Sequence, residues 1–428
     1  MKVLLINTSD HTGGAAIAAQ RLMKALQGQG LEAKMLCRDR VLPDERDDMV
    51  YLEPSFKLQL KFVLERLEIF LRNGFTRENV FAIDTARYGN NVTSLPEFKE
   101  ADVIHLHWTN QAMLSLQDLR AILHSGKPVV WTMHDMWPFT GICHHADTCT
   151  QWLQSCGNCR LLKRPRKKDM SYEVFHKKMK VYAQGHISFV ACSNWLKGLA
   201  VQSPLLQNSE VYSIPNPIDT NFYMPAGCEN TPTRNEIRHS LGFPTDKYLM
   251  LFAAYKVTDV NKGIDYLIES VTLLCQEHPE LRDKIAVVLT GKESDDVRQD
   301  FCVPTFSMGY VKDEKEMLRL YQAVDLMLMP TLMDNLPNTI MEAMACGTPC
   351  VAFNVGGLSQ MIDNETNGYL AEYRNSLDFA HGMARLLTSP SYAAISRNAR
   401  AKAVQAYSEK SVAEKYMKIY RSSLPQNS

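Results

Sequence analysis

A mixed α/β fold with two Rossmann-like domains is predicted by the length of the chain and by two series of alternating strands and helices. The chain has 428 residues, which is too long for one ordinary hydrophobic core and fits two domains of about 200 residues each. One series begins at Val3 and the other at Tyr248. Such alternation favours parallel sheets covered by helices on both faces.

The charge balance and the cysteine content exclude several classes of protein. Lysine plus arginine equals aspartate plus glutamate at 47 each, so no global field attracts nucleic acid or an acidic membrane. The apolar run Val3 to Ile6 is too short for a signal peptide, and no run approaches the length of a membrane span. Eleven cysteines then argue for a reducing compartment. We therefore expect a cytoplasmic protein.

The first strand is predicted over Val3 to Asn7, followed by a loop that contains Gly13 and Gly14 and by an alanine-rich helix. Strand, glycine loop and helix form the entry to a Rossmann-like unit. The dinucleotide fingerprint G-x-G-x-x-G is absent, which disfavours a dinucleotide oxidoreductase. A pair of glycines is by itself a weak signal that a simple turn also explains.

A helix rich in large apolar residues is predicted over Phe56 to Leu71. We favour a helix that packs on its own domain. The alternative is a helix that lies in a membrane interface, because the apolar surface is broad and basic residues flank it.

Two further strands, Asp102 to Trp108 and Pro128 to Asp135, carry histidines at their carboxyl ends. Ligands bind at this end of the strands in open α/β sheets. His105 and His107 share one face of their strand, and a core position is the better interpretation for His105. His134 is the stronger candidate for a ligand contact.

Four cysteines follow with the spacing C-x5-C-x6-C-x2-C, inside an insertion at residues 141–168: Cys143, Cys149, Cys156 and Cys159. Four thiolates at this density favour a closed, structural zinc site. An iron–sulfur cluster uses the same ligands, and four free thiols without a metal are the plain alternative. His144 or His145 is an alternative ligand.

The basic run from Lys163 to Lys168 comes next. Beside a cysteine knuckle it raises the hypothesis of a zinc-braced nucleic-acid-binding protein. It lacks interleaved aromatic residues, so we expect no nucleic acid and favour a solvated loop or a patch for anionic lipid headgroups.

Two prolines within Val211 to Asp219 stiffen the chain and mark the domain boundary. We place the first domain at 1–218, the second at 219–405, and a terminal helical segment at 406–428. No internal repeat is present.

In the second domain, Lys256 and Lys262 flank the loop after its first strand, where two cations suit a diphosphate. Farther along, a buried strand ends near Pro330 and a short helix is expected with Asn338 or Thr339 as its cap. Asp334 lies in the intervening loop and Glu342 about one turn into the helix. Helix-start amides suit a phosphate, and the flanking acids suit sugar hydroxyls.

The segment Asp334-x7-Glu342, followed by E-A-M-A-C-G-T-P, resembles the acid-x7-acid signature of the retaining nucleotide-sugar glycosyltransferases of the GT-B fold, in particular glycosyltransferase family 4. Lys262-Gly263 and the linker P-N-P-I-D also resemble that family. The chain departs from the family pattern in having Asp334 where glutamate is usual and Lys256 where arginine is usual.

The resemblance implies two Rossmann-like domains that face one another across a cleft, and a C-terminal helix within 406–428 that crosses back to the first domain. It also implies a retaining hexosyl- or related glycosyltransferase, of the kind that serves bacterial polysaccharide or glycolipid synthesis. Such an enzyme transfers a sugar from a nucleotide diphosphate to a hydroxyl of a glycan or lipid-linked glycan, without a catalytic metal. The alternative is an epimerase or phosphorylase of the same fold.

The resemblance also implies residue roles. The catalytic candidates are His134, Asp334 and Glu342, and the donor-binding candidates are Gly13, Gly14, Lys256, Lys262, Asn335, Leu336, Asn338 and Thr339. For a lipid-linked acceptor we expect peripheral contact with the inner face of the membrane through residues 56–72 and 163–168.

Overall fold

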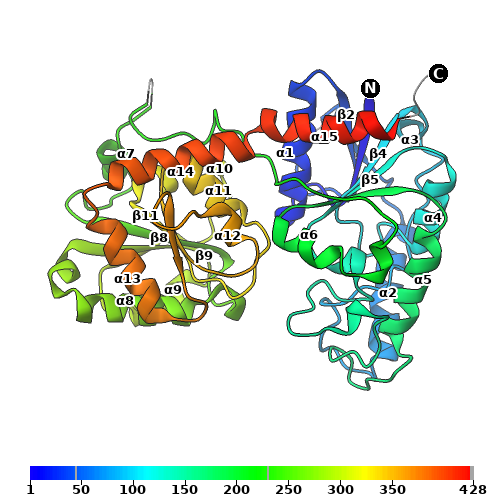
Figure 1. Ribbon diagram of the computed structural model, residues 1–428, viewed down its shortest axis with the longest axis horizontal. Coiled ribbons are helices and arrows are strands. Elements are labelled where there is room, and N and C mark those ends of the chain that lie inside the picture. Colours follow the sequence, from blue (N-terminus) through cyan, green and yellow to red (C-terminus); the bar gives the residue numbers. More distant parts are fainter. Residues whose placement is uncertain (44–45, 229–230, 425–428) are drawn as a thin grey trace. The chain divides into compact units, whose positions relative to one another are not determined.

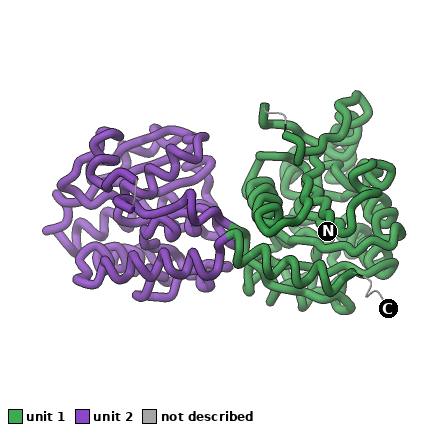
Figure 2. The backbone as a smooth tube through the Cα atoms, turned by 90° about the horizontal axis from the view of Figure 1, so that it is seen from above, with its two compact units in different colours: residues 1–217, 409–428 green, residues 218–408 purple. Residues whose placement is uncertain are grey.

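The computed structural model describes residues 1–43, 46–228 and 231–424. The chain forms two compact units, one of Met1–Pro217 with Glu409–Ser428 and the other of Ile218–Ser408 (Figure 2). The chain thus leaves the first unit at Pro217 and returns to it at Glu409. The segment expected at 406–428 extends over residues 425–428, which lie outside the described residues.

The first unit is built on a parallel sheet. Its strands are β1 (Lys2–Ser9), β2 (Glu32–Asp39), β3 (Met49–Tyr51), β4 (Val103–Leu106), β5 (Val129–Met133), β6 (Ile187–Ala191) and β7 (Val211–Ser213). Within the described residues the strand order is β3-β2-β1-β4-β5-β6-β7, and every neighbouring pair is parallel.

Helices cover both faces of this sheet (Figure 1). They are α1 (Gly14–Gly28), α2 (Phe56–Arg72), α3 (Pro96–Glu100), α4 (Leu116–His124), α5 (Met170–Tyr182), α6 (Asn194–Ala200) and α15 (Glu409–Ser423), with the short η1 (Trp137–Phe139), η2 (Gln151–Leu153) and η3 (Pro204–Leu206). Successive residues of β1 enter opposite cores, because side chains of a strand alternate between faces. Leu4 packs into the larger core, while Leu5 packs with α1 and α15.

The second unit has its own parallel sheet. Its strands are β8 (Tyr248–Lys256), β9 (Ile285–Lys292), β10 (Thr305–Ser307), β11 (Leu326–Met329), β12 (Cys350–Phe353) and β13 (Gly368–Ala371). In the described part of the chain the order is β10-β9-β8-β11-β12-β13, all parallel.

The helices of the second unit pack on this sheet (Figure 1). They are α7 (Arg234–Ser240), α8 (Ile264–Glu277), α9 (Ser294–Val297), α10 (Glu314–Ala323), α11 (Asn338–Ala345), α12 (Leu358–Met361), α13 (Ser376–Leu387) and α14 (Tyr392–Tyr407), with η4 (Val260–Lys262), η5 (Pro279–Lys284) and η6 (Arg298–Asp300). One core lies between the sheet and helices α8 and α13.

Two parallel α/β sheets confirm the predicted fold class. One local expectation was wrong: neither Asn338 nor Thr339 caps α11. The cap is Pro337, whose side chain makes no capping hydrogen bond, and Asn338 is the first helical residue. Proline fits this position because its ring fixes φ near the observed −65° and because a donor at a helix start has no intrahelical acceptor.

The last helix is fastened to the first sheet by buried hydrogen bonds around His105. Its Nδ1 lies 2.7 Å from the hydroxyl of Tyr420 and its Nε2 lies 2.8 Å from the hydroxyl of Thr132. The Thr132 hydroxyl also lies 2.8 Å from that of Tyr416. His105 is therefore a core histidine whose two ring nitrogens are both satisfied.

This network predicts acid lability. Burial, with a smaller contribution from His134, lowers the pKa of His105 to about 3. The unfolded chain therefore binds a proton that the folded chain does not, and the unfolding free energy falls as the pH drops from about 6.5 toward 3, by at most about 1.4 kcal/mol per pH unit.

Urea unfolding of the wild type and of His105→Gln measures this contribution, because effects of other groups cancel in the difference. The wild type is expected to be the more stable at pH 7, and its advantage is expected to shrink between about pH 6.5 and about pH 5. An advantage that stays constant over this range would contradict the assignment.

Candidate active site

A close approach of two loops builds the candidate site of the second unit. Gly263 follows η4 in the left-handed conformation, with φ of 75°. A Cβ atom at Gly263 would lie 1.9 Å from the carbonyl oxygen of Pro330, at the end of β11. The amide of Leu332 donates to the carbonyl of Asn261 at 2.8 Å. Only glycine permits this contact, which holds Lys262 beside the loop after β11.

Lys262 and Asp334 meet in this site. The ammonium Nζ of Lys262 donates to Oδ2 of Asp334 at 3.0 Å, and both side chains are partly buried. The other carboxylate oxygen of Asp334 accepts from the amide of Asn335 at 2.9 Å. The backbone of Asp334 also packs closely against Gly356. A Cβ atom at Gly356 would lie only 1.9 Å from the carbonyl oxygen of Asp334. The structure thus brings together a cation and an acid that lie 72 residues apart in sequence.

Glu342 occupies α11 and is 8% exposed. Its Oε2 accepts a hydrogen bond of 2.7 Å from the hydroxyl of Tyr321 on α10. Burial, followed by the charge of Glu342, raises the pKa of Tyr321 well above its usual value. Tyr321 therefore stays protonated and orients the carboxylate of Glu342 as a hydrogen-bond donor. No sequence motif indicates this partner.

The remaining donor-binding candidates of this unit lie along the same loop and helix. Asn335 is half-buried and Leu336 is 5% exposed, both between β11 and α11. Asn338 and Thr339 are the first two residues of α11, and both are half-buried. They lie at the carboxyl edge of the sheet, where the sequence placed them.

Lys256 differs from Lys262 in its environment. It is the last residue of β8, and its ammonium pairs with Glu293 at 2.9 Å, with both side chains largely exposed. Beside it, Lys292 contacts the hydroxyl of Tyr255 at 2.5 Å, and the ring of Tyr255 packs edge-on against Tyr310 with centroids 5.3 Å apart. The structure therefore does not pair Lys256 with Asp334.

In the first unit, Gly13 is the cap of α1 and has φ of 86°. A Cβ atom at this position would have no neighbour within 4 Å, so the conformation of the backbone explains the glycine. Gly13 and Gly14 are both exposed. They follow the carboxyl end of β1, the edge at which β4 and β5 also end.

His134 follows β5 and is half-buried. Its Nε2 lies 3.0 Å from Nδ1 of His107, and its Nδ1 lies 3.6 Å from the sulfur of Cys192. Burial lowers the pKa of His134 to about 4 and that of His107 well below its usual value. Both rings are therefore neutral at pH 7. The sequence placed His107 on this sheet edge but did not predict its contact with His134.

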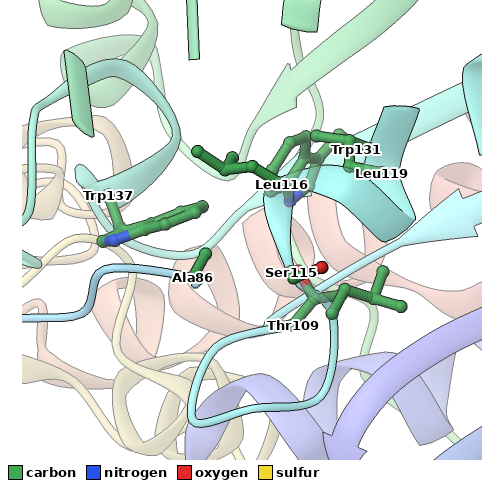
Figure 3. A pocket seen from close by; sticks show the side chains of 8 residues that line it. Ala86, Thr109, Ser115, Leu116, Leu119, Trp131 and Trp137 are labelled. Carbon is green, nitrogen blue, oxygen red and sulfur yellow. The ribbon is translucent and has the colours of Figure 1, made fainter. Parts of the chain in front are cut away.

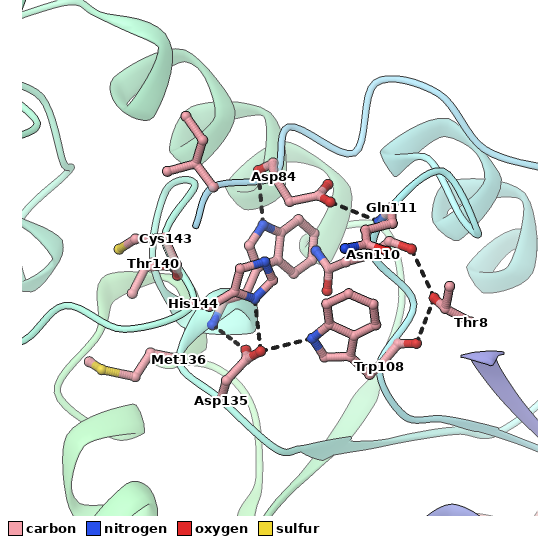
Figure 4. Close-up of polar contacts among 12 residues, drawn as sticks. Thr8, Asp84, Trp108, Asn110, Gln111, Asp135, Met136, Thr140, Cys143 and His144 are labelled. Carbon is pink, nitrogen blue, oxygen red and sulfur yellow. Dashed lines mark hydrogen bonds and ion pairs between the residues drawn. The ribbon is translucent and has the colours of Figure 1, made fainter. Parts of the chain in front are cut away.

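Asp135 ties the loop after His134 to its surroundings (Figure 4). Its Oδ2 accepts from Trp108 Nε1 at 2.9 Å and lies 2.8 Å from His144 Nδ1. Burial opposes ionisation of Asp135, but its interactions, led by His144, outweigh that effect and lower its pKa to about 2. Burial also opposes protonation of His144, yet Asp135 raises its pKa. The two form an ion pair that fixes the start of the cysteine-rich insertion.

A small cavity lies nearby, between Thr109, Trp131 and Trp137 (Figure 3). Its volume of about 10 Å³ matches the space that one water molecule needs. It is too small for a sugar.

The four cysteines of the insertion are reduced and lie in or against one hydrophobic core. Burial, with smaller contributions from neighbouring thiols, raises the pKa of Cys156 and of Cys159 to about 12. Cys156, Gly157 and Asn158 have φ values of 56°, 108° and 48°, which form a left-handed knuckle. Among the described residues, no group of three or more histidine, cysteine or acidic side chains is arranged to hold a metal ion.

Comparison with known proteins identifies two family models. Residues 12–222 match the model described as Glycosyltransferase Family 4, and residues 247–389 match the model described as Glycosyl transferases group 1. The two matches fall on different parts of the chain and together cover most of it.

Proteins of similar sequence include the D-inositol 3-phosphate glycosyltransferase of Saccharomonospora viridis, which is 28% identical over 204 residues. The aligned region covers 45% of this chain and 47% of that protein. An uncharacterized glycosyltransferase, MJ1607 of Methanocaldococcus jannaschii, is 28% identical over 191 residues, or 43% of this chain and 47% of that protein. The aligned regions span about half the length of these relatives.

Two solved structures match the whole fold. Anabaena Alr3699/HepE in complex with UDP has a TM-score of 0.64 at 17% identity, over 99% of this chain and all of that one. Sucrose-phosphate synthase from Thermosynechococcus elongatus has a TM-score of 0.63 at 16% identity, over 99% of this chain and 98% of that one. With parallel sheets in both units and glycosyltransferase models matching both parts of the sequence, the chain belongs to the family 4 and group 1 glycosyltransferases and has the GT-B fold.

Proposed function

We propose that this protein transfers a hexose or related sugar from a nucleotide diphosphate to a hydroxyl of a glycan or lipid-linked glycan, with retention at the anomeric carbon. The observation that carries the proposal is the contact between Lys262 and Asp334 at the edge of the second sheet, next to the start of α11. This contact joins a cation and one acid of the family signature in the loop that precedes α11, and the same helix carries the second acid, Glu342.

The donor diphosphate is assigned to this cation and helix start. The first amides of a helix lack intrahelical acceptors and attract phosphate oxygens. Lys262 adds a positive charge, and Lys256 is assigned as a second cation farther along the same edge. Glu342 accepts from ribose hydroxyls and Asp334 from sugar hydroxyls. The related fold of Anabaena Alr3699/HepE was solved with UDP-glucose, which supports a nucleotide-sugar as the donor class.

The chemistry needs no paired acid and base. The bond between the anomeric carbon and the phosphate oxygen breaks, and the acceptor oxygen bonds to the same carbon on the same face. The departing phosphate oxygen takes the acceptor proton. Lys262 and the α11 amides stabilise the charge that develops on the phosphate.

On the first unit, the neutral His134 is assigned a hydrogen bond to a sugar hydroxyl near the reacting carbon. His107 orients its ring through the contact between the two imidazole nitrogens. Gly13 and Gly14 are assigned a backbone contact with donor or acceptor, since exposed glycines let a ligand approach the main chain.

Replacing Lys262 tests the diphosphate site. Lys262→Met is expected to lower kcat/KM by about 100-fold, because charge-assisted bonds to phosphate are each worth about 1.5–3 kcal/mol. Lys256→Met is expected to have a smaller effect. Nucleotide diphosphate release in a screen of nucleotide-sugars, with and without glycan acceptors, is the measurement.

The matched control is Lys284→Met, which removes an exposed lysine at the amino edge of the same sheet. Equal activity of the Lys262 and Lys284 variants would refute the site. Product formed from the nucleotide-sugar without an acceptor would instead indicate an epimerase.

Replacing Glu342 tests the acid. Glu342→Gln retains an oxygen that accepts from Tyr321 but loses the charge, so the fold is expected to persist while kcat/KM falls by about 100-fold or more. Glu277→Gln, an exposed change at the end of α8, serves as the control. Wild-type turnover by Glu342→Gln, with an unchanged melting temperature, would remove Glu342 from the site.

A structural zinc ion bound by Cys143, Cys149, Cys156 and Cys159 is a separate part of the proposal. It rests on the sequence spacing, on the left-handed knuckle and on the single core in or against which the four thiols lie. Binding would draw the sulfur atoms closer together and release the protons that burial retains on them.

Elemental analysis of protein purified under reducing conditions tests this site. We expect about one zinc per chain, lost in the double variant Cys156→Ser/Cys159→Ser, with a melting temperature lower by several degrees. Iron with a visible absorption band would indicate a cluster. Absence of both metals, with all four thiols reactive toward a thiol reagent, would disprove the site.

A further inference from the structure

Helix α2 presents an apolar stripe to solvent. The stripe consists of Phe56, Leu60, Val63, Leu67 and Leu71, with exposed fractions of 79%, 38%, 54%, 45% and 46%. Their spacing of four, three, four and four residues places all five on one face of the helix. Phe75 and Phe81, 70% and 67% exposed, follow the helix. No other helix among residues 1–43, 46–228 and 231–424 has so many exposed large apolar side chains.

The opposite face of α2 is buried and carries charged residues beside the apolar Ile69. Arg66 donates to Glu65 at 3.1 Å and to Asp84 at 3.0 Å, and it also donates to the carbonyl of Val80 at 2.7 Å. Glu68 pairs with Arg72 and Arg87. A helix on an ordinary soluble surface buries its apolar face and exposes its charges. Helix α2 departs from this rule because it exposes the stripe, while the ion cluster and the fully buried Ile69 hold its opposite face on the domain.

A basic segment lies against the end of this stripe. The amide of Lys163 donates to Oδ1 of Asn73, the residue that ends α2, at 2.7 Å. Residues 163–168 are all exposed. In Figure 1, α2 and the loop before α5 lie at the same end of the first unit, and the ion pair of Arg72 with Glu173 on α5 joins them.

A cavity of about 280 Å³ lies where the stripe and the basic segment meet. Its lining includes the apolar Leu71 and Phe75 and the basic Arg164, Arg166 and Lys168. The two acids in the lining are engaged: Asp169 caps α5 and Glu173 pairs with Arg72. Within the described part of the chain, Arg164, Arg166 and Lys168 form no ion pair. The cavity therefore combines an apolar wall with uncompensated positive charge.

We propose that the α2 stripe and the basic segment 163–168 together dock on an anionic lipid bilayer, with a phosphate headgroup in the cavity and the stripe in the acyl boundary. An interfacial helix needs an exposed apolar face flanked by cations, and this surface has both. Each cation close to an anionic surface strengthens binding by about fivefold. Among the described residues, no part of the chain covers these five neighbouring apolar side chains.

The surface is suited to lying on a bilayer and not to spanning one. Within the described ranges, no helix has the length and apolarity needed to cross a bilayer. Docking on a bilayer requires neither the sugar donor nor the acceptor. A failure to bind vesicles would therefore not contradict the proposed transfer activity, and a lack of transfer activity would not contradict docking.

Co-sedimentation of the full chain with vesicles tests the proposal. The wild type is expected to bind phosphatidylcholine vesicles that contain phosphatidylglycerol and to be released by high salt, because 1 M salt shortens the screening length to about 3 Å. Val63→Asp/Leu67→Asp and Arg164→Glu/Arg166→Glu/Lys168→Glu are each expected to weaken binding by at least tenfold. All substituted side chains are exposed, and circular dichroism confirms folding.

The matched control is Val201→Asp/Val404→Asp, which places the same charges at exposed valines outside the surface. This control is expected to bind like the wild type. Wild-type protein that stays in the supernatant with anionic vesicles, or equal weakening by the control, would overturn the proposal. So would a wild-type dimer in sedimentation velocity that the stripe variant abolishes, since the occupant would then be a second copy of the chain.

Discussion

The contact between the Lys262 loop and the end of β11 is the constraint on which the candidate donor site depends. Gly263 is left-handed and lies within van der Waals distance of the Pro330 carbonyl only because it has no side chain. Any other residue would push the loop outward by more than an ångström. Lys262 would then separate from Asp334, and the cation would leave the start of α11. The absence of a side chain at Gly263 thus determines whether the positive charge of Lys262 lies beside Asp334 at the carboxyl edge of the second sheet.

The sequence predicted the larger part of this architecture for identifiable reasons. Buried parallel strands are continuous apolar runs, so Val3 to Asn7 and Leu326 to Pro330 stood out, and glycines marked the turns that follow them. The short edge strands β3 and β7 carry only three residues each and gave no comparable signal. The cap of α11 was mispredicted because Asn338 has the favoured side chain, whereas the geometry of Pro337 decides the position.

Residues of the candidate site were found when they lay inside a motif and missed when they acted through space. Asp334, Glu342 and Lys262 are in motifs. Tyr321 contacts Glu342 from a neighbouring helix, 21 residues away, and His107 contacts His134 across adjacent strands. Such pairings depend on register and on the direction of side chains, which periodicity alone does not supply. The exposed apolar stripe of α2 was equally hidden, because a helical pattern does not state which face meets the protein.

The division of the chain has a consequence for its synthesis. Helix α15 closes one face of the first sheet, where Tyr416 and Tyr420 are buried against His105 and Thr132, yet all of the second unit precedes it in the chain. A ribosome therefore releases the second unit as a continuous segment that is able to fold at once, while one face of the first sheet is covered only in part, by α1, until translation reaches residue 423. The first unit is therefore the first to be synthesised and the last to be completed.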